Sequence, residues 1–140
     1  MNQNTNNLFS LLIEYKQTIH LCVYSCIVDK PGPPDSPTIS DVHKTGCTVA
    51  WQPPKEDGGT PVTGYHIERH LTSSDRWLKV NSGAVTELTY KVNDLVEGSE
   101  YEFRVSAENK VGVGPPSSPS KPFVAKDPFS ECLLLYGLQL

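Results

Sequence analysis

The side chains that could do chemistry are few, and none has partners at the spacing that a reactive site needs. His20, Cys22 and Cys26 offer nitrogen and sulfur donors, and Cys-x-x-x-Cys lies within the wider range of zinc spacings. No second matching pair follows, so the sequence predicts no metal site. His43 and His66 fall on turns or outward strand faces, where we expect unliganded surface histidines.

Catalysis needs convergent groups, and the sequence does not predict them. The chain contains Ser, His and Asp, but no Gly-x-Ser-x-Gly elbow and no triad-like spacing. Ser117, Ser118 and Ser120 lie among prolines in a predicted turn. Gly112-Val113-Gly114 lacks the third glycine of a dinucleotide loop and indicates a β-turn. We therefore predict no catalytic residue, no cofactor and no small-molecule substrate, and so no enzyme.

Composition sets further bounds on function. The chain has 140 residues, of which 37% are hydrophobic and 20% charged, a size that favours one domain. The formal charge of −4 gives no basic face for nucleic acid or anionic lipid. The 12 prolines and 10 glycines show no period, which favours a fold with many turns.

The cysteines favour a reducing compartment. Cys22, Cys26 and Cys132 lie outside the segment that should fold, so Cys47 has no partner there for an internal disulfide. No Asn-x-Ser/Thr sequon occurs. Both absences favour an intracellular protein. Cys47 itself alternates with Val49, which predicts a small packed side chain.

The two ends differ from the middle of the chain. Residues 1–30 form an irregular leader whose apolar stretch is interrupted by Glu14, Lys16 and His20, so neither a signal peptide nor a membrane helix is predicted. Residues 127–140 begin as a linker and end in an apolar tail. We hypothesise that both ends come from intron or frame read-through in a predicted gene.

Residues 31–126 carry short runs of alternating apolar and polar residues, separated by Pro, Gly, Asp and Asn. No convincing helical period occurs there. Seven strands without helices imply two packed antiparallel sheets, with about ten large apolar side chains pointing inward. The strands are expected at 38–42, 47–51, 65–68, around 77–80, 88–92, 101–107 and 121–125.

The residues in this middle segment resemble the fibronectin type III family. Trp51 followed by Pro53-Pro54 resembles the end of the family's second strand, and Gly64-Tyr65-His66-Ile67-Glu68-Arg69 its third. Leu95 followed six residues later by Tyr101 resembles the tyrosine corner, whose phenol bonds to upstream backbone. The resemblance implies an all-β, seven-stranded, immunoglobulin-like sandwich with irregular terminal tails.

A narrower likeness points to modules of the titin and twitchin group of giant sarcomeric proteins. It rests on four segments: Pro31-Gly32-Pro33-Pro34, Asp57 to Tyr65, Glu108 to Gly114, and Ala125 to Phe129. This likeness implies a fragment of a muscle protein that spaces and docks on the myosin filament of the sarcomeric A-band. It also implies neighbouring immunoglobulin-like or fibronectin type III modules as partners.

Two surface segments could bind such partners: the acidic turn Lys55 to Gly59 and the loop Glu108 to Gly114. Both are also explained as turns and inter-module contacts alone. The loop lacks the Arg-Gly-Asp of adhesive members, so integrin binding is not predicted.

Two other functions stay open at this point. One is an ectodomain module of a cell-surface receptor or adhesion protein, which a leader with a cleavage site or sequons would favour. The other is a targeting module attached to a kinase, which only downstream sequence could reveal. Fold-level likeness does not separate them, because this sandwich hosts many binding roles.

Overall fold

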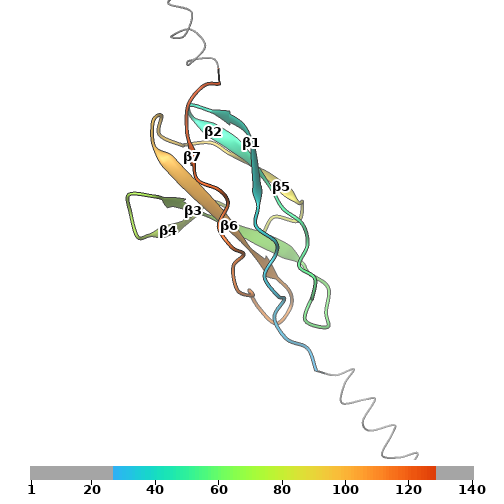
Figure 1. Ribbon diagram of the computed structural model, residues 1–140. Helices are drawn as coiled ribbons and strands as arrows, with labels where there is room; N and C mark the ends of the chain where they lie inside the picture. The colour runs from blue at the N-terminus through green and yellow to red at the C-terminus, as the bar shows by residue number, and fades with distance from the viewer. Residues whose placement is uncertain (1–26, 129–140) are drawn as a thin grey trace, which may run out of the picture.

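The computed structural model describes residues 27–128, which form two antiparallel β-sheets packed face to face (Figure 1). One sheet has three strands in the order β1-β2-β5, and the other has four in the order β4-β3-β6-β7. The strands are β1 (Thr38–His43), β2 (Gly46–Ala50), β3 (Gly64–Leu71), β4 (Trp77–Lys79), β5 (Thr89–Val92), β6 (Glu100–Glu108) and β7 (Phe123–Val124). The predicted all-β sandwich is confirmed, and no helix occurs in the range described.

Alternation along β2, β3 and β6 builds the interior, because successive side chains of a strand point to opposite faces. Val49, Ile67 and Phe103 have no exposed surface at all. Trp51 follows β2 and meets Tyr65 edge to face, with ring centroids 5.5 Å apart. The buried hydrophobic side chains are Cys47, Val49, Trp51, Tyr65, Ile67, Val92, Leu95, Tyr101, Phe103, Val105, Ala107 and Ala125. The segment 31–125 therefore closes its own interior without the rest of the chain.

The predicted tyrosine corner is present. The backbone N–H of Val96 donates to the hydroxyl of Tyr101 over 3.1 Å. Leu95 is buried beside it, and its own N–H donates to the carbonyl of Thr45. These bonds fix the crossover from the three-stranded to the four-stranded sheet.

The serines of the 115–120 segment are more than turn residues, so that part of the sequence interpretation was incomplete. The N–H of Ser117 donates to the carbonyl of Val105, and its hydroxyl accepts from the N–H of Val105. Ser120 makes the same reciprocal pair with Phe103. The hydroxyls replace main-chain acceptors, so this proline-rich segment lines β6 without being a regular strand.

Because serine hydroxyls take the place of main-chain acceptors here, β7 is shorter than predicted. The sequence favoured a strand over 121–125, and the structure has one only at Phe123–Val124. Pro122 has no N–H for a ladder, and Ser120 pairs through its side chain. Leu88 also differs from its expected place, since β5 begins at Thr89 and Leu88 is exposed at the sheet edge.

Removing the corner hydroxyl tests its contribution. We expect Tyr101→Phe to lower the free energy of unfolding by about 1 kcal/mol, the usual net value of one hydrogen bond. Denaturant unfolding would measure it. Tyr90→Phe is the matched control, because the hydroxyl of Tyr90 has no hydrogen bond among the residues described. Equal effects of the two changes would contradict the corner's role.

Trp51 tests the position of the core. Trp51→Ala removes a nearly fully buried indole and leaves a cavity against Tyr65. We expect a loss of about 3–5 kcal/mol, enough to unfold much of the population. A cooperative thermal transition unchanged from wild type would show that Trp51 lies outside the true core.

Candidate functional site

The outward face of β3 and β6 carries one ion pair and two histidine–carboxylate pairs. The register pairs Glu68 with Arg104, and the guanidinium Nε donates to the carboxylate over 2.6 Å. On either side of this pair, histidines of β3 meet carboxylates of β6. His66 Nε2 lies 2.7 Å from Glu108, and His70 Nδ1 lies 3.4 Å from Glu102. The face is thus a row of paired polar groups, in which the buried Nδ1 of His66 has no hydrogen-bond partner among the residues described.

Trp77 of β4 completes this face. The guanidinium carbon of Arg104 lies 4.3 Å from the centroid of its ring, a cation–π contact. The imidazole of His70 stacks on the ring with centroids 4.8 Å apart. Tryptophan and arginine are the residues most enriched among interface hot spots. We call the outward side chains of His66, Glu68, His70, Trp77, Glu102, Arg104 and Glu108 the charged face.

Sequence reasoning missed the charged face as a unit. The alternation did place Glu68, Glu102 and Arg104 outward. Which charge meets which follows only from the β3–β6 register, and Trp77 joins them only through the β3–β4 pairing of His70 with Trp77. No motif in the linear sequence encodes that arrangement.

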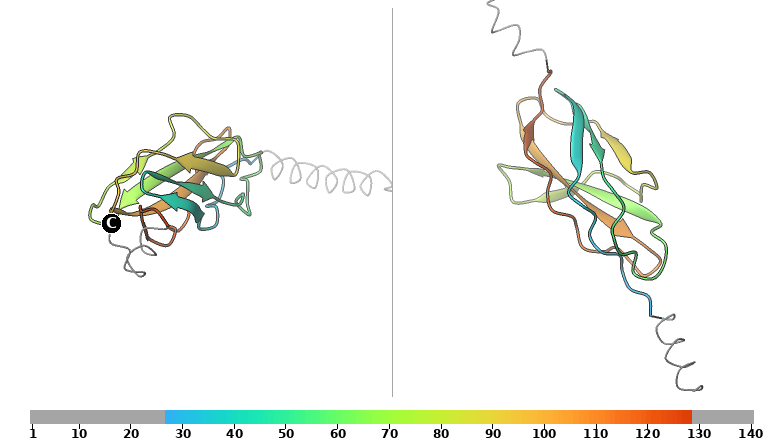
Figure 2. Two further views of the ribbon diagram at one scale, coloured as in Figure 1. Left: turned by 90° about the horizontal axis from the view of Figure 1, so that it is seen from above. Right: turned by 45° about the vertical axis from the view of Figure 1, so that its right-hand side comes forward.

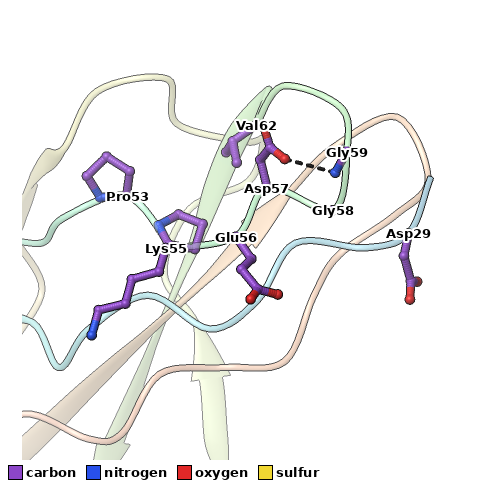
Figure 3. A pocket seen from close by; sticks show the side chains of 9 residues that line it. Asp29, Pro53, Lys55, Glu56, Asp57, Gly58, Gly59 and Val62 are labelled. Carbon is purple, nitrogen blue, oxygen red and sulfur yellow. Dashed lines mark hydrogen bonds between the residues drawn. The ribbon is translucent and has the colours of Figure 1, made fainter. Parts of the chain in front are cut away.

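The two predicted binding segments lie at one end of the sandwich, close together (Figure 3). Asp57 accepts from the N–H of Gly59, and Asn109 donates to the carbonyl of Asp57. The 55–59 turn borders an open hollow of about 690 Å³ that Asp29, Pro53, Pro54 and Val62 also line. The side chains of Lys55 and Glu56 are exposed and form no ion pair within residues 27–128. This hollow offers an open surface for contact, lined by charged residues and by Pro53, Pro54 and Val62.

No three His, Cys, Asp or Glu side chains come together to hold a metal in the part of the chain described. His20, Cys22, Cys26 and Cys132 lie outside the described residues. His43 is exposed and accepts from Thr45, whereas His66 is largely covered by its neighbours. Across residues 27–128, no helix is both long enough and apolar enough to cross a bilayer.

Cys47 packs as the small apolar residue that was predicted. It is a buried free thiol, and burial raises the pKa of its Sγ from 9.0 to about 12. A thiol that stays protonated is a poor nucleophile, because the thiolate is the reactive form. The position therefore serves packing.

Residues 32–123 match the family model described as the fibronectin type III domain. The chain belongs to the fibronectin type III family. It is 45% identical over 105 residues to cardiac-type myosin-binding protein C of Gallus gallus, a match that covers 75% of this chain and 8% of that protein. It is 43% identical over 113 residues to fast-type myosin-binding protein C of Homo sapiens, covering 81% of this chain and 10% of that protein. The chain thus spans about a tenth of the length of these curated relatives.

Solved structures agree with the narrower resemblance. A crystal structure of titin domains is 40% identical with a TM-score of 0.68, over 71% of this chain and 34% of that one. A titin module from human cardiac muscle is 33% identical with a TM-score of 0.64, over 70% of this chain and 95% of that one. The fibronectin type III domain described here is therefore similar to modules of titin and of myosin-binding protein C, and the predicted likeness to the titin group is confirmed.

The buried thiol gives a pH prediction. The unfolded domain releases the Cys47 proton near pH 9, whereas the folded domain keeps it until about pH 12. Between these values the folded state binds more protons, so stability falls as pH rises, by of the order of 1 kcal/mol per pH unit. Urea unfolding from pH 8 to 11 should show a shallower fall for Cys47→Ala than for wild type. Identical slopes would mean that Cys47 does not titrate in this way.

Proposed function

We propose that the chain is a non-enzymatic module of a titin- or twitchin-like muscle protein, which spaces that protein along the thick filament and docks on it. The observation that carries the proposal is the 45% identity to a myosin-binding protein C, together with the likeness to titin modules. The A-band of the sarcomere is the proposed location, with the myosin filament and adjoining modules as partners.

The shape suits a spacer. The described chain enters at one end of the sandwich and leaves at the other (Figures 1 and 2). A pull along the chain would load the β1–β2 and β6–β7 hydrogen bonds, because β1 and β7 are the first and last strands of the chain. Stability under load would come from these ladders and from the serine pairs that hold the 117–120 segment on β6.

The charged face suits docking on the filament. Its groups are partly exposed and held in place by their mutual contacts, so little side-chain entropy remains to be lost on binding. Trp77 offers an aromatic anchor at its edge. Charged groups also make such an interaction weaken as salt rises.

Cosedimentation of the full chain with myosin filaments tests the proposal. We expect binding that weakens with ionic strength, and a loss of about thirtyfold or more in affinity for Trp77→Ala, as for a hot-spot residue. Actin filaments serve as the comparison filament.

Leu78→Ala is the control variant. Leu78 is the next residue of the same strand, exposed and directed to the opposite side. Its removal should leave filament affinity within about twofold, since one exposed contact away from the face carries little energy. Wild-type binding by Trp77→Ala, in a protein shown to be folded, would remove the charged face from the interface. No binding of the unaltered chain to myosin would end the proposal.

The domain limits belong to the same proposal. We take 31–126 as the module, with the irregular leader 1–30 and the tail 127–140 as segments that are not native parts of a module array, although Asp29 and Asp127 at their inner ends are hydrogen-bonded to the module. Sequencing the spliced transcript is the direct check. Finding both ends encoded in mature message would contradict their read-through origin.

A further inference from the structure

The segment that leads into the sandwich is bound to it before β1 begins. The N–H of Asp29 donates to the carbonyl of Gly58 over 2.8 Å, and the N–H of Gly32 donates to Glu56 over 2.9 Å. Pro31, between them, is fully buried. Residues 29–32 therefore run along the 56–58 turn like a short added strand.

Asn109 closes this attachment. Its residue is 3% exposed, and its side-chain Nδ2 donates to the carbonyls of Asp29 and Asp57 at 2.7 and 2.8 Å. Its Oδ1 accepts from the N–H groups of Val111 and Gly112. One buried amide thus joins the incoming segment, the 55–59 turn and the 108–114 loop.

Two glycines permit the close approach. Gly58 has a φ of +79°, and a Cβ there would lie 2.1 Å from the carbonyl oxygen of Asp29. A Cβ on Gly114 would lie 2.0 Å from the carbonyl oxygen of Pro31. Any larger residue would push the incoming segment off the loops. We call residues 29–32, 56–58 and Asn109 the latch.

Exposed apolar side chains surround the latch. Ile27 is 64% exposed, and Val28, Val111 and Val113 are about 36 to 42% exposed. A Cβ added to Gly59 would lie 3.2 Å from the carbonyl oxygen of Ile27, and one added to Gly112 would lie 3.2 Å from Cε of Lys30. The incoming segment and both loops therefore lie at the same end. The opposite end is fastened as well, since the N–H of Lys44 donates to the carboxylate of Asp127.

We infer that the latch end is the seat of the β-sandwich module that precedes this one, and that Asn109 positions that module by fixing the direction in which the chain arrives. The inference rests on the proposed function, which supplies the preceding module. The occupant follows from chain direction, because the incoming segment Ile27 to Gly32 lies beside the 56–59 turn at this end. If residue 128 of one copy were joined directly to Ile27 of the next, only residues 128, 27 and 28 would separate the bonded Asp127 from the bonded Asp29, so we expect that junction to be stiff.

Amide hydrogen exchange on the full chain tests the latch itself. The Asp29 and Gly32 amides should be protected in wild type, and Asn109→Ala should reduce that protection by about tenfold, as expected for a lost buried hydrogen-bonded clamp. Asn81→Ala is the matched control. Asn81 is also a buried amide, bonded to Ile67, Tyr65 and Gly83, but it does not touch the latch. In Asn81→Ala, the exchange protection of the Asp29 and Gly32 amides should stay as in wild type when it is compared with the protection of the core amides.

The outcomes separate the latch from the filament proposal. Unprotected Asp29 and Gly32 amides in the wild-type chain would overturn the latch, whether or not the chain binds myosin. If the Asp29 and Gly32 amides are protected but the chain does not bind myosin, the latch is supported and only the filament proposal is contradicted. Nuclear Overhauser contacts from residues 1–26 to Val111 or Val113 would show that the chain's own leader covers this surface. That result would overturn the inference that a preceding module binds there.

A tandem tests the seat, with a second copy of residues 27–128 joined directly ahead of Ile27 of the first. Residual dipolar couplings should give the two copies alignment tensors of equal magnitude. The chemical shifts of Val111 and Val113 in the downstream copy should differ from those in the single domain. In the tandem with Asn109→Ala in the downstream copy, the two magnitudes should differ by about twofold or more. Independent alignment of the copies in the unaltered tandem would overturn the proposal.

Discussion

The antiparallel ladder between β3 and β6 is the contact on which the rest of the molecule depends. It joins Gly64–Leu71 to Tyr101–Glu108 through eight facing pairs, from Gly64 with Glu108 to Leu71 with Tyr101. Because side chains alternate, one register fixes both faces of the sheet at once. The inner face supplies Ile67 and Phe103 to the core, and the outer face aligns Glu68 with Arg104. A slip of one residue would exchange the two sets and abolish both the interior and the charged face.

The ends of this ladder also determine what lies at the ends of the molecule. The Gly64–Glu108 pair is followed immediately by Asn109, so the ladder carries the latch amide to a fixed place beside the 55–59 turn. At the other end, Tyr101 pairs with Phe123 of β7, and its hydroxyl accepts a hydrogen bond from the N–H of Val96. The corner and the latch thus act at opposite ends of one strand, β6. A force or a partner at either end meets the same continuous element.

The sequence predicted the fold well where a strand is buried on one face. Alternation is clear in Cys47 to Trp51, Tyr65 to Ile67 and Tyr101 to Ala107, and the Leu95–Tyr101 spacing identified the corner. It predicted less at the edges, since β5 and β7 are held by few partners and proline removes ladder donors. The roles of Ser117, Ser120 and Asn109 could not be predicted, because each depends on a main-chain group far away in sequence. The candidate surfaces were found as two loops, but the charged face required the register.

The separation of these roles explains how one sandwich can serve many proteins of its family. Interior residues such as Val49 and Phe103 make no contact with solvent, so they govern whether the domain folds and leave its partners open. Residues of the charged face contact mainly one another, and the Glu68–Arg104 pair is about a quarter exposed on each side. Pairs of this kind add little to stability in water, so their arrangement can vary at small cost to the fold. What this chain binds is therefore determined by its outward side chains and loop ends, whereas its fold is determined by the opposite faces of the same strands.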